Sequence, residues 1–283
     1  MEPLRSISTL SVLGPGLDHP EGVAWGPDGK VYAGGEGGQI YRVDLATNAV
    51  ETYANTGGFA LGLAHDAAGN AYVCDQGRAT VMKVTPGGDV SVYSSGTADR
   101  PMRVPNYPVF DAAGNLYVSD SGTWGTGDGY IWRVAPNGRA DLWDTQANGF
   151  TNGMCLGPDG RSLYVVESTP PCIVRIPMND DGSPGAREVV VELPRTVPDG
   201  VAFDTAGTLY ISLYNPNIIY AFRDGRLDVL YDDWQQLMLI APTNIAFGGS
   251  DMKTLLIANL CGWNLCSTTM DVPGLPVKYP SLS

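Results

Sequence analysis

One pattern of short apolar segments recurs six times along the chain, and this repeat constrains the fold more than any other feature. Each copy contains an apolar run, a turn, and a second apolar run, as in EGVAW-GPDG-KVYAGG and NYPVF-DAAG-NLYVSD. The runs are rich in Val and Tyr, and their apolar residues are packed too tightly for a helical period of 3.6. Two further apolar runs complete most copies, so the repeat predicts a unit of four short strands.

The last residue of the first run marks the register of the six copies. These residues are 40 to 47 positions apart, and they are Trp25, His65, Phe110, Leu156, Phe203 and Phe247. Four short strands at this period are typical of a propeller blade. The sequence therefore predicts an all-β fold, a six-bladed β-propeller with four-stranded blades, in which residues 1–283 form a single domain. A β-sandwich is the alternative, and six regular copies disfavour it.

The two ends of the chain predict how the ring closes. The sixth copy loses its regularity after Asn259, while residues 4–13 form an apolar run before the first copy. An unpaired strand edge is a liability that propellers remove by closure. We therefore expect the N-terminal strand to complete the last blade and the C-terminal LPVKYP tail to lie on the outside.

Composition excludes several classes of protein. The formal net charge of −13 leaves no basic stripe for nucleic acid. The five cysteines have irregular spacing and no C-x-x-C pair, although a bridge between Cys261 and Cys266 stays open. The sequence has no apolar stretch of the roughly 18–20 residues that would span a membrane, and its first residues lack a signal-peptide pattern. These features predict a cytoplasmic protein, a monomer or weak homodimer, that binds neither nucleic acid nor membrane.

A second register position is chemically uneven, and that unevenness indicates a site. Four residues before each register residue stand Glu21, Leu61, Asn106, Asn152, Asp199 and Thr243. This position begins the innermost strand of each predicted blade, where side chains converge on the channel. Four of the six are carboxylates or carboxamides, and oxygen ligands of this kind suit a hard divalent cation. We expect calcium, with zinc, magnesium and manganese as alternatives.

A turn-capping role is the competing interpretation of the same residues. Asp and Asn often cap turns, and both Asn152 and Asp199 precede a glycine. A capping role for any one of them is plausible. Four such caps in the same repeat position are a weaker explanation than one shared site.

Loops that follow the second strands border the same mouth of the channel and supply candidate substrate contacts. Asp120 and Tyr214 lie in two of these loops, and Trp124 in the long SDSGTWGTGDGY segment is a candidate lid or platform. Arg103 lies three residues before Asn106 and is expected to reach a substrate oxygen. Of the two histidines, His65 occupies a core register position, and His19 is a candidate neighbour of the site. No G-x-S-x-G motif is present, which argues against a serine hydrolase.

At these positions the sequence resembles the senescence-marker-protein, gluconolactonase and luciferin-regenerating family. The segments that carry the resemblance are PEGVAWGPDGKVY, TNGMCLGPDGRSLYVVES, VPDGVAFDTAGTLYISLY and IAFGGSDMKTLLIANL. The resemblance implies a six-bladed propeller with a calcium- or zinc-type ion held by Glu21, Asn152 and Asp199. It also implies Asn106 and Arg103 as substrate contacts and Asp199 as the general base. The third blade reads RVPNYPVF where sugar lactonases of this family have R-x-N-D-G, which leaves a sugar lactone and a less polar lactone both open.

The predicted activity is metal-dependent hydrolysis of a small lactone or related ester. A cation in the channel would polarise the carbonyl and acidify a water molecule, and Asp199 would take its proton. Two alternatives use the same residues: a phosphotriesterase-like hydrolase, and a non-enzymatic propeller module with a structural calcium ion.

Overall fold

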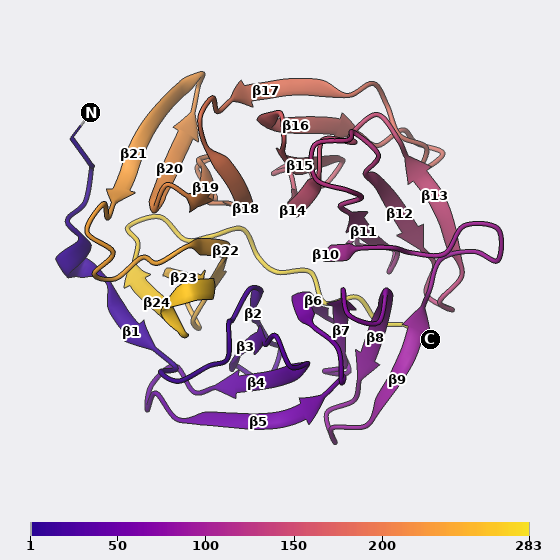
Figure 1. Ribbon diagram of the computed structural model, residues 1–283, viewed down its shortest axis with the longest axis horizontal. Coiled ribbons are helices and arrows are strands. Elements are labelled where there is room, and N and C mark those ends of the chain that lie inside the picture. The colour runs from indigo at the N-terminus through magenta and orange to yellow at the C-terminus, as the bar shows by residue number, and fades with distance from the viewer. Residues whose placement is uncertain (1, 283) are drawn as a thin grey trace.

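The computed structural model describes residues 2–282, whose strands form six four-stranded antiparallel sheets around one axis (Figure 1). The sheets are arranged like blades, with the first strand of each repeat nearest the axis. This arrangement confirms the six-bladed β-propeller that the repeat predicts. The helical elements of the described residues are two short 3-10 turns, η1 (Ile7–Thr9) and η2 (Leu260–Gly262).

Each of the first five blades is built from four consecutive strands. The first two blades contain β2 (Val23–Trp25), β3 (Val31–Gly34), β4 (Gln39–Val43), β5 (Val50–Asn55), β6 (Ala60–His65), β7 (Ala71–Asp75), β8 (Thr80–Val84) and β9 (Val90–Ser94). The third and fourth contain β10 (Pro105–Phe110), β11 (Leu116–Asp120), β12 (Tyr130–Val134), β13 (Ala140–Asp144), β14 (Thr151–Leu156), β15 (Ser162–Ser168), β16 (Pro171–Pro177) and β17 (Glu188–Glu192). The fifth contains β18 (Val197–Phe203), β19 (Leu209–Asn215), β20 (Ile218–Arg223) and β21 (Arg226–Asp232).

The predicted register residues mark the ends of the innermost strands. Five of these strands end at the expected residue, and the sixth, β22 (Pro242–Gly248), ends one position beyond Phe247. The turn that follows explains the ending. In the third blade the Asp111 carboxylate accepts the backbone N–H groups of Ala113 and Asn115, which turns the chain back into β11.

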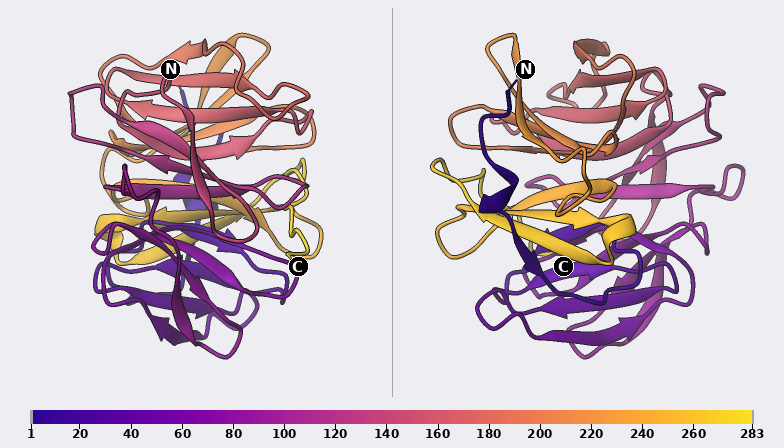
Figure 2. Two further views of the ribbon diagram at one scale, coloured as in Figure 1. Left: turned by 90° about the vertical axis from the view of Figure 1, so that its right-hand side faces the viewer. Right: turned by 60° about the vertical axis from the view of Figure 1, so that its left-hand side comes forward.

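The N-terminal strand closes the last blade, as the sequence predicts. Strand β1 (Ser11–Leu13) pairs antiparallel with β24 (Asn264–Thr269), so the sixth sheet has the order β1-β24-β23-β22, with β23 spanning Thr254–Asn259. Figure 2 shows this N-terminal segment, in indigo, beside the orange and yellow strands of the last two blades. The strand is shorter than the expected run of residues 4–13, because the Ser6 hydroxyl accepts the Ser8 N–H and the chain forms η1 there.

The expected position of the C-terminal tail is wrong. The tail crosses the end of the channel opposite the innermost strand entries, and Figure 1 shows it in yellow passing over the centre. Backbone hydrogen bonds tie it to several blades: Leu275 N–H donates to Phe203, Thr205 N–H to Pro273, and Ala67 N–H to Pro280. The Tyr279 hydroxyl also donates to the carbonyl of Trp25. The tail therefore lines a largely apolar chamber of about 360 Å³ in that half of the channel.

Two smaller points follow from the described residues. All five cysteines, which lie within residues 2–282, are free, including buried Cys266 and exposed Cys261, so no bridge joins these two. Within residues 2–282, no helix has the length and apolar character needed to cross a membrane.

His65 lies in the core between the first two blades, as the sequence predicts. The residue is 2% exposed, and its ring is tilted against the Tyr32 ring, with the two centroids 4.3 Å apart. Burial disfavours the charged imidazolium and lowers the pKa of His65 to about 4. The unfolded chain takes up this proton at a pKa of 6.5, so stability is lost as the pH falls from about 6.5 to about 4.

This cause predicts the behaviour of His65→Phe, which installs the residue that three other blades have at this position. When the pH is lowered from 7 to 4.5, we expect the unfolding free energy of both proteins to fall. The fall should be smaller in the variant by about 2 to 3 kcal/mol, because the variant has no buried imidazole to protonate. Urea unfolding of both proteins at the two pH values measures the difference. Parallel pH dependence of the two proteins would contradict the assignment.

Candidate metal centre

The uneven register position lies at an irregularity in the innermost strands. In five blades the pairing between first and second strands shifts there, between Ala60 and Leu63, Pro105 and Pro108, Thr151 and Met154, Pro198 and Val201, and Pro242 and Ile245. Such a bulge releases two successive residues from the ladder and re-aims their side chains. The backbone N–H groups that the bulge leaves are satisfied from the second strand, because Ser119 Oγ accepts from Tyr107 and Ser212 Oγ from Gly200.

We call the six residues at the uneven register position the ring. The residue that follows each ring member is glycine in four blades. These residues are Gly22, Gly62, Gly153 and Gly200. A Cβ on Gly22 would lie 2.3 Å from the carbonyl oxygen of Leu61, and one on Gly153 would lie 2.5 Å from that of Asp199. At these two glycines the neighbouring innermost strand lies so close that a side chain would clash with its backbone.

Two carboxylates from distant parts of the chain meet at one amide. The Asn244 Nδ2 group donates to Glu21 Oε1 at 3.2 Å and to Asp199 Oδ1 at 3.4 Å, and also to the Glu21 backbone carbonyl at 3.2 Å. Thr243, the ring member of the sixth blade, donates its hydroxyl to the same carbonyl at 2.7 Å. The structure thus brings Glu21 and Asp199 into one buried site.

Several oxygen atoms in this ring are buried without a partner. Among residues 2–282, no hydrogen-bond donor reaches Glu21 Oε2, Asn106 Oδ1, Asn152 Oδ1 or Asn244 Oδ1. All four residues are at least nine-tenths buried. Buried polar atoms almost always have partners, and each exception requires an explanation such as an ion.

The electrostatics of the ring give the same indication. Burial and the nearby Asp199 charge raise the pKa of Glu21 well above its usual value, and the hydrogen bond from the Asn244 side chain offsets part of this rise. Burial also raises the pKa of Asp199 to about 7, and the Asn152 side chain offsets part of this rise. Two carboxylates in one buried site repel each other unless a positive charge lies between them.

A divalent cation fits this set of donors. Two carboxylates, free amide oxygens and burial match the all-oxygen ligand sets of hard cations, whereas no histidine or thiolate is within the group to favour a soft one. The residues that would hold the ion are Glu21, Asn152 and Asp199, and the unpartnered Asn106 oxygen belongs to the same repeat position.

Asp120 has contacts that indicate a structural role. It is fully buried, and its carboxylate accepts the backbone N–H groups of Arg103 and Val104 and the indole N–H of Trp132. Carboxylates at the same repeat position behave alike, since Glu167 accepts the N–H groups of Asn148 and Gly149. Each holds the loop that leads into the innermost strand of its own blade.

The other candidate substrate residues lie on the rim. Arg103 is engaged by Asp128, through Oδ2 at 2.8 Å and the carbonyl at 2.6 Å, and its guanidinium lies over the Tyr130 ring. Trp124 is 54% exposed, with its ring 4.9 Å from that of Phe150. Tyr214 is also exposed, at the end of β19. The structure therefore does not bring these three side chains into the buried ring.

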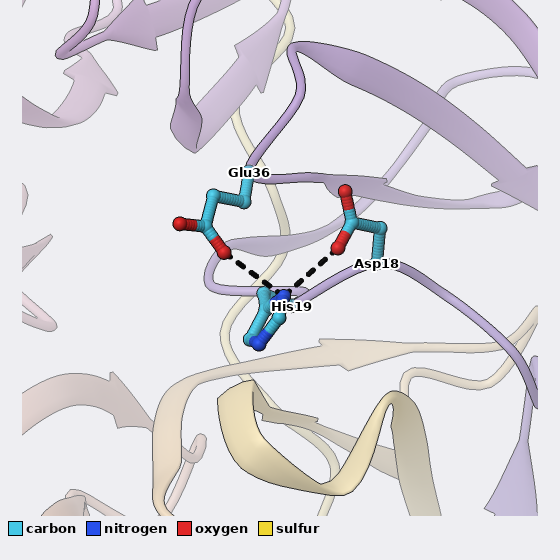
Figure 3. A group of neighbouring side chains, drawn as sticks. All are labelled: Asp18, His19 and Glu36. Atoms are coloured by element: carbon cyan, nitrogen blue, oxygen red, sulfur yellow. Dashed lines mark hydrogen bonds and ion pairs between the residues drawn. The ribbon is translucent and has the colours of Figure 1, made fainter.

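His19 belongs to a separate group on the loop that precedes Glu21 (Figure 3). Its Nδ1 lies 2.8 Å from Asp18 Oδ1 and 3.0 Å from Glu36 Oε2. The ring also stacks on Trp263 at 4.9 Å. These three side chains lie close enough to share an ion, but they are partly exposed and satisfy one another.

Asn244 is the residue of the centre that the sequence reasoning missed. Its signal was present, because it is an amide at the repeat position that is glycine in four other blades. The predicted site contained only residues of the preceding repeat position, so it did not include Asn244.

Comparison with known proteins identifies the family. Residues 19–260 match the model of the SMP-30/gluconolactonase/LRE-like region, so the chain belongs to this family. A 6-deoxy-6-sulfogluconolactonase from Pseudomonas putida is 32% identical over 145 residues, which are 44% of this chain and 47% of that protein. Lactonase drp35 from Staphylococcus aureus is 29% identical over 120 residues, which are 41% of this chain and 37% of that protein. The chain thus spans less than half the length of these curated relatives.

Solved structures share the fold over nearly the whole chain. A gluconolactonase from Xanthomonas campestris superposes with a TM-score of 0.79 at 19% identity, covering 94% of this chain and 89% of that one. The calcium-binding protein regucalcin from Agrobacterium tumefaciens gives 0.79 at 17% identity, covering both chains fully. At such low identity these likenesses establish the propeller fold.

The close approach of the innermost strands yields a prediction for Gly200→Ala. The new Cβ would lie 2.7 Å from Asn244 Cα and 2.8 Å from the Thr243 carbonyl oxygen, and neither backbone atom can move freely. We expect a loss of about 1 to 3 kcal/mol of unfolding free energy. Gly87→Ala is the matched control, because its Cβ would meet nothing closer than 3.7 Å. Equal stability of the two variants in urea unfolding would contradict the packing argument.

Proposed function

We propose that this protein is a metal-dependent lactonase whose reaction takes place over the ring of Glu21, Asn152 and Asp199. The observation that carries the proposal is the group of buried oxygens without hydrogen-bond partners among residues 2–282, set around two adjacent carboxylates. Glu21, Asn152 and Asp199 would hold a divalent cation, which would supply Lewis-acid chemistry for the lactone carbonyl and for a water molecule. We expect calcium, with zinc, magnesium or manganese as alternatives.

The residues of the chain divide the remaining tasks. Glu21, Asn152 and Asp199 would hold the cation, and the buried Asn106 amide would orient the substrate from the next blade. Asp199 would also accept the proton of the attacking water as the general base. A lactone suits this division, since one nucleophilic attack opens the ring and leaves both ends in one molecule.

The substrate is a small lactone or related ester, and the family and its lactonase members support this class. Trp124, Tyr214 and Arg103 stand on the surrounding loops as candidate contacts for the outer part of the substrate. A cytoplasmic location and a monomeric or weakly dimeric state stay predictions.

Isosteric substitutions test the proposal. We expect Asp199→Asn and Glu21→Gln to lower kcat/KM for γ- and δ-lactones roughly 100-fold or more, because each removes a charge from the centre. Chelation with EDTA should abolish the wild-type activity, and added calcium should restore it. Asp141→Asn, which removes an exposed carboxylate on β13, is the control and should retain wild-type kinetics.

The same assays separate the alternatives. Turnover that survives both chelation and Asp199→Asn would exclude the metal mechanism. Hydrolysis of aryl phosphotriesters without lactone hydrolysis would indicate a different hydrolase at the same centre. No turnover on either class, with calcium still raising the melting temperature, would indicate a binding module with a structural ion.

A further inference from the structure

We infer that Asn244 is a positioning residue that sets the separation of the Glu21 and Asp199 carboxylates before a cation binds. The inference rests on the proposed metal centre and adds a residue that the ring position does not include. The Asn244 side chain is buried, with 1% of the residue exposed.

The repeat position of Asn244 argues against a role in backbone packing alone. Four blades have glycine at this position, and the backbone of the sixth blade follows the same bulge without it. An asparagine is therefore not required for the bulge. Its amide is an addition to the repeat at the point where the first, fifth and sixth blades meet.

The orientation of the amide follows from its surroundings. On one side lie the Glu21 carbonyl, Glu21 Oε1 and Asp199 Oδ1, all acceptors, at 3.2 to 3.4 Å. Only the amide nitrogen can face three acceptors, so the oxygen must point the other way. One NH₂ group thus ties a carboxylate of the first blade to a carboxylate of the fifth.

Two glycines leave room for this orientation. The Asn244 oxygen lies 2.9 Å from where a Cβ would stand on Gly153, and 2.9 Å from where one would stand on Gly200. A side chain at either position would therefore displace the oxygen. The glycines of the fourth and fifth blades thus allow the amide to keep its nitrogen toward the two carboxylates.

The consequence concerns affinity for the cation. Without the amide, two buried carboxylates that repel each other are free to turn apart, and binding must first bring them together. Partners that orient metal ligands typically contribute 10- to 100-fold to metal affinity. The amide also offsets part of the like-charge repulsion in the metal-free protein.

Substitution to the residue of the other blades tests the inference. We expect Asn244→Gly to weaken calcium binding roughly 10- to 100-fold, and Asn244→Ser, whose hydroxyl can donate to only one carboxylate, to weaken it less. Isothermal titration calorimetry of chelator-treated protein with calcium, and separately with manganese and zinc, measures the affinities. The serine variant also provides the answer if the glycine variant does not fold.

Asn115→Ala is the matched control. Asn115 is also buried and also donates to a carboxylate, Asp111 Oδ2 at 2.8 Å, but in a turn at the other end of its blade's innermost strand. It should lose stability while keeping wild-type metal affinity. Wild-type affinity in both Asn244 variants would overturn the inference and leave the metal centre intact. A wild-type protein that binds none of the three cations would overturn the proposed function and the inference together.

Discussion

The close approach of the innermost strands is the constraint on which the rest of this structure depends. A Cβ on Gly22 or on Gly153 would lie within 2.5 Å of a backbone carbonyl oxygen of the next blade, so these strands approach as closely as they do because that atom is missing. Each bulge at this level turns the preceding residue out of the ladder toward the axis. The glycine position and the ring of polar residues before it are therefore two results of the same geometry.

Convergence also places charge where the fold alone would not favour it. Glu21 and Asp199 are both about 94% buried, and their mutual repulsion and desolvation oppose folding unless something neutralises them. Thr243 and Asn244 hold the Glu21 carbonyl, so the first and sixth blades are joined at the axis as well as at the rim, where β1 pairs with β24. The centre is thus fixed by the closure of the ring, which lets the protein keep two carboxylates together before a cation binds.

Most of the fold could be predicted from the sequence, because equivalent residues of the blades recur at nearly regular spacing along the chain. The ends of five innermost strands and the closing strand followed from residue spacing alone. The contacts of Arg103 and the C-terminal tail did not, since each depends on segments that differ from blade to blade. Arg103 is held by Asp128 in a long insertion. The role of Asp120 also did not follow from spacing, because it accepts backbone N–H groups from the loop before β10. Metal binding by the four oxygen donors of the ring stays a prediction. The buried oxygens without hydrogen-bond partners support it, and residue spacing does not show them.

Departures from the repeat carry information that the repeat itself cannot. The glycine position is broken twice, by Asn244 and by Tyr107. Asn244 is explained by the two carboxylates that it ties together. Tyr107 packs its ring over Gly62, with Cδ2 2.4 Å from where a Cβ would stand, and so fills the space that the missing side chain leaves. It also lines the apolar chamber below the ring, directly after Asn106. One departure adds a hydrogen-bond donor beside the charges, and the other adds an aromatic wall beneath them. Four blades thus have glycine at this position, where neighbouring backbones are close. In the other two blades the same position supplies a side chain that contacts the centre or the chamber beside it.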